Sequence, residues 1–529
     1  MGKTACTHPE FTMSAATPNA RARWVRAGLA AALVAGPMPL LSVTSPVATG
    51  ATTRTAGSVG TGVVALASDS QLVPSDVRLY RTRTSLLGRH EWYRQVRAGR
   101  VVVGGVYARH YDLDGNLVSV WDGRRKLSGG QLADVEIGSS TAMSVATAES
   151  GDMVVERPEL MVLPAAAAGT DRERLVWAVD TEGAEGPVVS YVDAQRGVVL
   201  EQDNHAKFAG GSGSDLVTGR GRVFDPNPVV ARQNQTLLDR RDRSTVALER
   251  AYRIVNLPRL RESRGLAGRW VRIMDDHRAV SATDRYVYSR TNDRFEQVMA
   301  YFAVDRAQAY LQGLGFRDVN AESQAVVTDR YPDDNSFYNE GRDVIQLGSG
   351  GVDDAEDVEI IWHEYAHAIQ DDQVPGFGAR PQSGAIGEGF GDYFAVTMSA
   401  PTTRDTVRTP LACVADWDSV SYDRTAPHCL RRVDGRLTYD DRTFDIHHDG
   451  RIWSRALWDI SRTLEPTKPG QTARAMANRL IIEAQFWMQP RITMPAAARI
   501  TVRTARDLDG ASAATTVRSA FAARGILPG

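Results

Sequence analysis

The chain has few lysines, few cysteines and almost no net charge. Its 62 basic residues against 64 acidic ones leave a formal charge of -2, which gives no electrostatic footprint for a nucleic acid or an acidic membrane. Three cysteines in 529 residues exclude a disulfide-dense scaffold. The hydrophobic content is 43% and the mean hydropathy is -0.30. These values exclude a multi-span membrane protein and are typical of a globular chain with two or three domains.

The N-terminus has the pattern of an export signal. Arginines cluster within residues 21–26, an apolar stretch follows over residues 27–43, and small residues come next. The apolar stretch is short for a bilayer span and contains Pro37. We therefore expect residues 1–51 to be a signal peptide and leader, so that the protein is secreted and has no stable membrane insertion afterwards. A single membrane anchor is the alternative.

Two cysteines remain after this leader, and an exported chain favours their pairing. Cys413 and Cys429 are 16 residues apart, and closing a loop of that length stabilises a fold by about 3 kcal/mol in the chain-entropy model. The sequence thus predicts a Cys413–Cys429 disulfide. The alternative is a pair of unrelated buried thiols.

The remaining chain divides into two regions of different pattern. Residues 69–203 show short apolar runs between turn signals, which indicates an α+β module, and no catalytic cluster. Residues 204–215 are polar and glycine-rich, which is typical of a linker and of a site of proteolytic processing. Residues 216–529 contain more helical patterns, including a predicted helix over 293–316 with Gly313 and Gly315 as candidate C-caps.

One segment of the second region has the spacing of a metal site. His363 and His367 are four residues apart within an amphipathic pattern, so both imidazoles lie on one face of a helix and can share a zinc ion. Glu364 follows the first histidine and is placed to act as general base toward a zinc-bound water. The alternative is a helix with two ordinary surface histidines.

A catalytic zinc needs a third protein ligand and one open position. Glu388 follows His367 by 21 residues, which is room for a loop and a returning helix. Asp392 lies four residues further on the same face, where it can accept a hydrogen bond from a ligand histidine. The alternative for Glu388 is a solvated helix carboxylate.

Two adjacent histidines form a further candidate. His447 or His448, ahead of a predicted helix, would stabilise the negative charge that develops on a carbonyl oxygen during hydrolysis. The alternative is a pair of loop histidines bonded to neighbouring aspartates. The residues alone do not choose between them.

Several blocks of the sequence resemble the fungalysin family of thermolysin-like zinc metalloproteases, the gluzincins. The resemblance is carried by HEYAHAIQ, GEGFGDYFA, the HxxGxxW spacing of His447, Gly450 and Trp453, and the ending RSAFAARGIL. The segment over 69–203 is similar to a fungalysin/thermolysin propeptide with a PepSY module. The block that begins with Asn335 and Ser336 resembles the strand that pairs with peptide substrate.

The resemblance implies a fold and a set of roles. The expected fold is α+β: a propeptide module, then a two-lobe metallopeptidase with a strand-rich N-lobe, a helical C-lobe and zinc in the cleft between them. His363, His367 and Glu388 would be zinc ligands, Glu364 and His447 catalytic, Asp392 a support for a ligand histidine, and Asn335 and Ser336 substrate-binding. Thermolysin-like enzymes also bind calcium, so the acidic run over 353–357 is a candidate calcium site; the simpler alternative is carboxylates that complement a helix dipole.

These observations predict a secreted zinc endopeptidase made as an autoinhibited precursor. Its partners would be protein or peptide substrates and its own propeptide, without nucleic acid. One alternative is a secreted binding or adhesion protein whose zinc site is structural or vestigial. Another is a gluzincin aminopeptidase, although no GxMEN-type segment for holding a free amine is present. The natural substrate, the processing points and the oligomeric state are not given by the sequence.

Overall fold

The computed structural model describes residues 72–148, 153–154, 157–183, 186–203, 216–261, 265–466 and 471–529. The predicted signal peptide and the predicted linker lie outside the described residues. Among the residues that are described, no helix is both long enough and apolar enough to cross a membrane.

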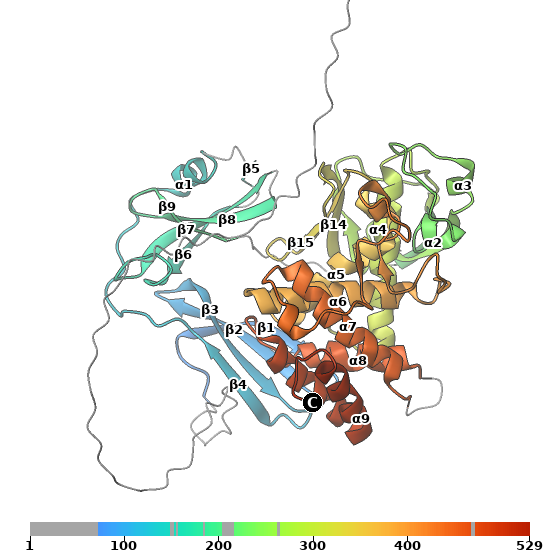
Figure 1. Cartoon of the computed structure of the whole chain (residues 1–529). Coiled ribbons are helices and arrows are strands. Elements are labelled where there is room, and N and C mark those ends of the chain that lie inside the picture. Colours follow the sequence, from blue (N-terminus) through green and yellow to red (C-terminus); the bar gives the residue numbers. More distant parts are fainter. Residues whose placement is uncertain are drawn as a thin grey trace, which may run out of the picture. The chain divides into compact units, whose positions relative to one another are not determined.

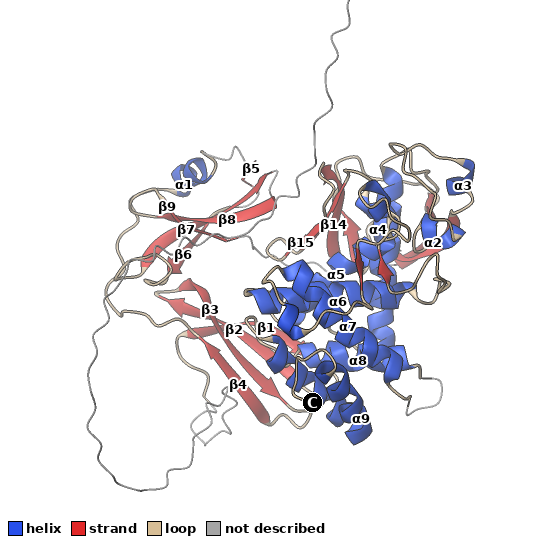
Figure 2. Cartoon of the chain, viewed as in Figure 1, coloured by secondary structure: helices blue, strands red, loops and turns tan. Residues whose placement is uncertain are grey.

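The N-terminal region, residues 72–203, is mostly β-sheet (Figures 1 and 2). Antiparallel strands β1 to β4 are joined to strands β5 to β9 by one parallel pairing, between Val102 and Val162. Its elements are β1 (Val77–Thr84), β2 (Arg89–Arg97), β3 (Arg100–Tyr111), β4 (Leu117–Gly123), α1 (Ser139–Ala146), β5 (Met153–Val154), β6 (Glu159–Leu163), β7 (Arg174–Gly183), β8 (Gly186–Asp193) and β9 (Val199–Asp203).

The turns predicted in this region are present. Asp112 accepts hydrogen bonds from the backbone N–H groups of Asp114 and Asn116, at 3.0 and 2.8 Å, and so closes the turn between β3 and β4. Gly115 in that turn has a φ of 82°, which a side chain would disfavour. A second turn, with Gly197 at a φ of 66°, connects β8 to β9.

The C-terminal region begins with short strands and continues mainly as helices (Figure 2). Its first part contains β10 (Leu216–Val223), α2 (Pro228–Arg232), α3 (Val246–Glu249), β11 (Arg253–Arg261), β12 (Val271–Ile273), β13 (Arg285–Tyr286), α4 (Arg294–Leu314), β14 (Gln324–Tyr331), β15 (Phe337–Asn339), β16 (Val344–Gly348) and the 3₁₀ helix η2 (Asp354–Glu356). The strands form two sheets, ordered β11-β10-β13 and β12-β14-β16-β15, so that β15 is an edge strand.

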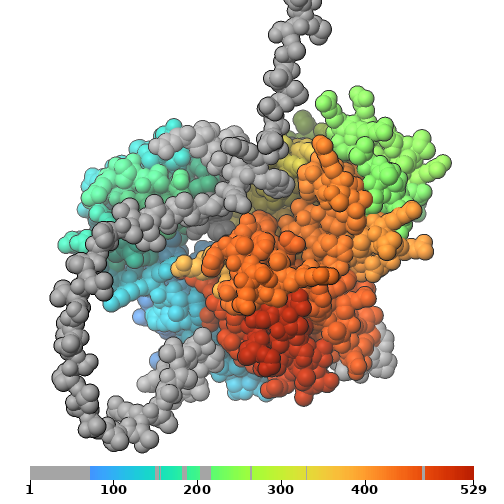
Figure 3. All heavy atoms as spheres, viewed as in Figure 1, coloured from blue at the N-terminus to red at the C-terminus, as the bar shows by residue number. Residues whose placement is uncertain are grey.

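The second part of this region carries the long helices. Its elements are α5 (Val358–Gln373), α6 (Pro381–Ser399), β17 (Cys413–Val414), η3 (Asp418–Ser421), β18 (Arg431–Arg432), η4 (Tyr439–Asp441), α7 (Ile446–Thr463), α8 (Ala473–Gln485) and α9 (Met494–Ala522). Helix α6 packs against both α5 and α7. The atoms of the C-terminal helices, orange to red in Figure 3, form a continuous surface. The mixed fold, with a strand-rich first part and a helical second part, is the one predicted.

The apolar side of helix α5 packs against α4. Trp362 and Tyr365 are fully buried; the indole N–H of Trp362 donates to the Ala303 carbonyl at 2.9 Å, and the Tyr365 hydroxyl donates to Gln308 at 2.7 Å. Both partners belong to α4. Because the apolar face is fixed against α4, the opposite face, which carries His363 and His367, has one defined orientation.

Two details of the observed helices differ from the predictions made from the sequence. Gly313 lies inside α4, and Gly315, with a φ of 104°, is the residue that caps it. The histidine pair His447 and His448 lies within the first turn of α7 and not ahead of it, because Asp445 caps that helix and accepts from the His448 N–H at 2.9 Å. The Asp445 carboxylate satisfies a backbone N–H of the first turn, which sets the start of the helix.

Candidate metal centre

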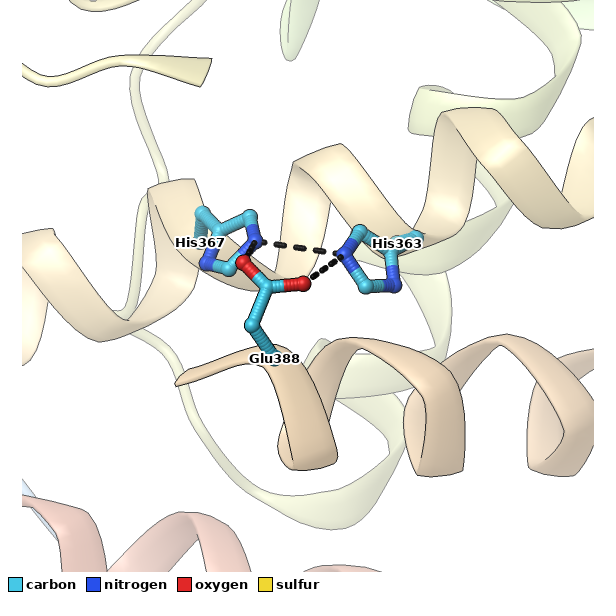
Figure 4. Close-up of side chains that lie close together, drawn as sticks. All are labelled: His363, His367 and Glu388. Atoms are coloured by element: carbon cyan, nitrogen blue, oxygen red, sulfur yellow. Dashed lines mark hydrogen bonds and ion pairs between the residues drawn. The ribbon is translucent and has the colours of Figure 1, made fainter. Parts of the chain in front are cut away.

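Helix α5 brings two imidazole nitrogens close together. The Nε2 atoms of His363 and His367 are 3.3 Å apart, as the four-residue spacing predicted (Figure 4). His363 is 5% exposed, so water does not compete freely for this nitrogen. The arrangement offers two imidazole nitrogens as ligands to one ion.

Helix α6 supplies the carboxylate of Glu388 from the opposite side (Figure 4). Its oxygens lie 3.3 Å from His363 Nε2 and 3.5 Å from His367 Nε2. A tetrahedral ion with ligands at about 2.0–2.1 Å separates its ligand atoms by about 3.3 Å. Glu388 Oε2 is buried, and one ligand atom from each of the three residues lies within 4.8 Å of the other two, so the three side chains can hold a zinc ion.

Charged neighbours keep Glu388 in the form that binds a cation. Burial raises the pKa of this carboxyl, but His447 and His363 outweigh burial and hold the pKa well below its usual range. Helices α6 and α7 approach closely beside Glu388. Gly450 of α7 permits this approach, because a Cβ at position 450 would meet the Glu388 Cβ at 2.8 Å.

Glu364 lies on the same helix with a buried carboxylate that is 6% exposed. Burial raises its pKa to about 7, and the backbone N–H of Tyr338 donates a hydrogen bond to it. A carboxylate with a pKa near neutrality suits the exchange of a proton with water. Tyr338 belongs to the edge strand β15, and sequence reasoning missed it because a backbone donor leaves no signature in the side chains.

Asp392 and Arg431 form a layer behind the metal-facing residues. Asp392 Oδ1 lies 3.0 Å from His363 Nδ1, and Arg431 binds both Asp392 oxygens through Nε and a terminal nitrogen at 2.8 Å each. The Arg431 terminal nitrogen also lies 3.9 Å from Glu388 Oε2. Arg431 was not predicted, because it reaches Asp392 across 39 residues of sequence; its one signal is its place two residues after Cys429.

The disulfide predicted from the two cysteines is present. Cys413 and Cys429 are bonded with a Cα–Cα distance of 5.3 Å. Cys413 lies on β17, which pairs antiparallel with β18, the strand that carries Arg431. The bond therefore tethers the segment that supports Asp392.

The two adjacent histidines face different groups. His447 Nε2 lies 3.4 Å from Glu388 Oε2, and its side chain is 58% exposed. His448 Nδ1 lies 3.1 Å from Asp449. Of the pair, His447 is thus the imidazole beside the candidate metal ligands, and its role stays a prediction.

The predicted substrate residues Asn335 and Ser336 lie just before β15. The Ser336 hydroxyl donates to Asp354 at 2.5 Å and accepts the Gly348 N–H at 3.1 Å, so it is engaged inside the fold. Their substrate role stays a prediction, and the residue whose backbone reaches Glu364 is Tyr338.

The acidic run before α5 has protein partners. Asp357 caps α5 by accepting the Glu359 N–H at 3.1 Å, and Glu356 accepts from Arg290 Nε at 2.8 Å and from the Trp417 indole at 2.9 Å. Asp357 thus lies at the start of the helix, as the alternative of carboxylates that complement the helix dipole requires. Calcium binding stays a prediction.

Residues 346–527 match the model of the fungalysin metallopeptidase family (M36). No curated protein matches the chain. Among solved structures, the precursor of protealysin, a metalloproteinase from Serratia proteamaculans, is 18% identical, with a TM-score of 0.33, over 43% of this chain and 79% of its own. The Bacillus megaterium YpeB C-terminal domain is 11% identical, with a TM-score of 0.18, over 24% of this chain and 56% of its own. Likenesses this low carry no argument.

The family match spans His363, Glu364, His367, Glu388 and Arg431. The blocks HEYAHAIQ, GEGFGDYFA, HxxGxxW and RSAFAARGIL lie inside the matched segment, whereas residues 69–203 and the residues Asn335 and Ser336 lie outside it. Residues 346–527 are thus similar to the fungalysin metallopeptidase family (M36), and the family resemblance of the sequence is confirmed over this segment.

Proposed function

We propose that the protein is a secreted zinc endopeptidase made as a precursor that its own N-terminal region inhibits. One observation carries this proposal: the Nε2 atoms of His363 and His367 lie 3.3 Å apart, and the two Glu388 oxygens lie 3.3 Å from His363 Nε2 and 3.5 Å from His367 Nε2, respectively. These separations match the edges of a tetrahedral zinc site. Three protein donors leave one position open, as a catalytic site requires.

Zinc, when bound, would supply a Lewis acid and a water of lowered pKa. Glu364 then accepts a proton from the attacking water and later passes it to the leaving amine. His447, exposed on the open side of Glu388, donates a hydrogen bond to the carbonyl oxygen as negative charge develops there. Asp392 fixes the orientation of His363 through its Nδ1.

The edge strand β15 supports a peptide as the substrate. Its outer edge is unpaired among the described strands, and Tyr338 within it contacts Glu364. An extended peptide that adds to this edge would lie beside the general base with its backbone hydrogen-bonded. Such binding does not need a free terminal amine, and this favours an endopeptidase over an aminopeptidase.

The N-terminal region has the contacts expected of a propeptide. The Ser85 hydroxyl and the Leu86 N–H both donate to Glu483 of α8 at 2.8 Å, and Arg83 pairs with Asp372 at the end of α5. The proposal places the signal and leader at 1–51, the propeptide at 69–203, the processing segment at 204–215 and the peptidase at 216–529.

The test is hydrolysis of casein by the secreted product, with and without a chelator, for the wild type and Glu364→Gln. We expect chelator-sensitive cleavage that Glu364→Gln abolishes while zinc content is retained. Chelator-insensitive activity or full activity of the variant would refute the proposal and favour a binding protein. Peptides with blocked and free amines separate the endopeptidase from an aminopeptidase.

Processing has its own test. N-terminal sequencing of the secreted product is expected to find a start between residues 203 and 216. A start near residue 69 would show that the N-terminal region is retained and is not a propeptide.

A further inference from the structure

At the C-terminal end of helix α5, the carbonyl groups of Asp371 and Asp372 accept hydrogen bonds from a side chain. The Asp371 carbonyl would pair with the N–H of the residue four positions later, but that residue is Pro375, which has none. The Asp372 carbonyl would pair with Gly376, whose N–H instead donates to Asp371 Oδ1 at 3.0 Å. Carbonyl groups left over at a helix end attract cations.

A guanidinium group from the N-terminal region fills this position. Arg81 of β1 donates from one terminal nitrogen to the Asp371 carbonyl at 2.8 Å and to the Asp372 carbonyl at 3.2 Å. The same nitrogen lies 3.7 Å from Asp372 Oδ1 and 3.9 Å from Asp371 Oδ2. These carbonyls and carboxylates surround the Arg81 guanidinium, and we call them together the basic-side-chain pocket.

A second arginine binds beside the first. Arg83 Nε lies 2.8 Å from both Asp372 oxygens, and its terminal nitrogen is 2.5 Å from Glu322. Arg81 and Arg83 are two residues apart on β1, so their side chains project from the same face of the strand. Asp371 and Asp372 are 3% and 5% exposed. If β1 leaves with the N-terminal region, these buried carboxylates lose the two cations that pair with them here.

The basic-side-chain pocket lies one helical turn from a candidate metal ligand. Asp371 is four residues after His367, one helical turn or about 6 Å along α5, on the same face. Tyr338 lines a cavity that Arg81, Asp371 and Asp372 also line. Its hydroxyl donates to Asp343 at 3.0 Å, while its backbone contacts Glu364. A peptide extended along β15 from Glu364 would therefore pass the pocket within a residue or two.

We propose that this pocket is a substrate subsite of the peptidase for an arginine side chain, which Arg81 occupies in the precursor. The inference rests on the proposed endopeptidase function. Arginine suits the site better than lysine, because its planar donors reach carbonyl and carboxylate oxygens together. The N-terminal region thus blocks the enzyme by placing its own arginine where a substrate arginine binds.

The test uses the secreted, processed product of the full chain and peptides of one parent sequence. A single arginine is moved through each position on both sides of the scissile bond and is replaced there in turn by lysine and by citrulline, its neutral isostere. We expect one position at which kcat/KM is about tenfold or more higher for arginine than for citrulline, with lysine between them. An equal rate for arginine and citrulline at every position would overturn the inference.

Variants connect the preference to the pocket. Asp372→Asn keeps an acceptor for the Asn320 N–H, which bonds this side chain at 2.8 Å, and is expected to lower the arginine-to-citrulline ratio about tenfold. Glu322→Gln, at a more exposed carboxylate, is expected to lower the ratio less. Asp507→Asn, at an exposed site on α9, is the matched control and should keep the ratio. A ratio unchanged in Asp372→Asn and Glu322→Gln would place the preference elsewhere and overturn the inference.

The outcome is separable from the proposed function. Chelator-sensitive cleavage of the citrulline peptides without preference for arginine would leave the endopeptidase standing and remove the subsite. Absence of cleavage of every peptide and of casein would remove the proposed function itself.

Discussion

Removal of the Asp392 carboxylate is predicted to weaken zinc binding without touching a proposed zinc ligand. Asp392 is 1% exposed, and its Oδ1 lies 3.0 Å from His363 Nδ1. The hydrogen bond fixes the ring orientation and makes Nε2 a better donor to the metal. Loss of such a partner lowers metal affinity by about 10- to 100-fold, or about 1.4 to 2.7 kcal/mol.

The structure adds a second contribution to the effect of Asp392→Ala. Arg431 is 14% exposed and would lose its three hydrogen bonds to Asp392. Its terminal nitrogen already lies 3.9 Å from Glu388 Oε2, so it is expected to turn toward this carboxylate and compete with zinc for it. We therefore expect Asp392→Ala to lower the zinc affinity by close to the upper limit of this range, about 100-fold. The double variant Asp392→Ala/Arg431→Ala should recover part of the affinity.

The assay is competition for zinc against a chromogenic chelator, with circular dichroism to restrict the comparison to folded protein. Asp507→Asn serves as the surface control. An unchanged zinc affinity in Asp392→Ala would refute the proposed link between Asp392, Arg431 and the metal. So would a double variant that binds zinc more weakly than Asp392→Ala alone.

The remaining predictions concern catalysis, stability and helix packing. Glu364→Gln is expected to retain zinc and lower kcat by at least about 100-fold, since it removes a general base; normal turnover of casein would contradict this. Replacing Cys413 and Cys429 by serine is expected to lower the free energy of unfolding by about 3 kcal/mol for a 16-residue separation, and unchanged denaturant midpoints under oxidising conditions would count against it. Gly450→Ala places a Cβ 2.8 Å from the Glu388 Cβ, so α7 must shift away from α6 and zinc affinity should fall; equal affinity would show that the helices adjust freely.

Most of the candidate metal centre follows from the sequence because its geometry is local. His363 and His367 lie on one helix, whose 3.6-residue period sets their Nε2 atoms 3.3 Å apart. Glu388 comes from the next helix, and the short connection returns it to the same face. The amphipathic pattern around the two histidines also predicted a buried side for this helix, and Trp362 and Tyr365 lie on that side in the structure.

The groups that the sequence did not reveal act across long separations or through the backbone. Arg431 reaches Asp392 from a β-strand 39 residues away, and Arg81 reaches the Asp371 carbonyl across 290 residues. Tyr338 contributes a backbone N–H to Glu364, and any residue except proline can supply that group. Such contacts depend on how elements pack, which residue spacing does not encode.

Metal content tests the central claim most directly. Folded, processed protein should contain one zinc per chain by elemental analysis, and His363→Ala and Glu388→Ala should each remove it while Asp507→Asn retains it. Correctly folded wild-type protein without stoichiometric zinc, or with zinc that survives both substitutions, would contradict the account.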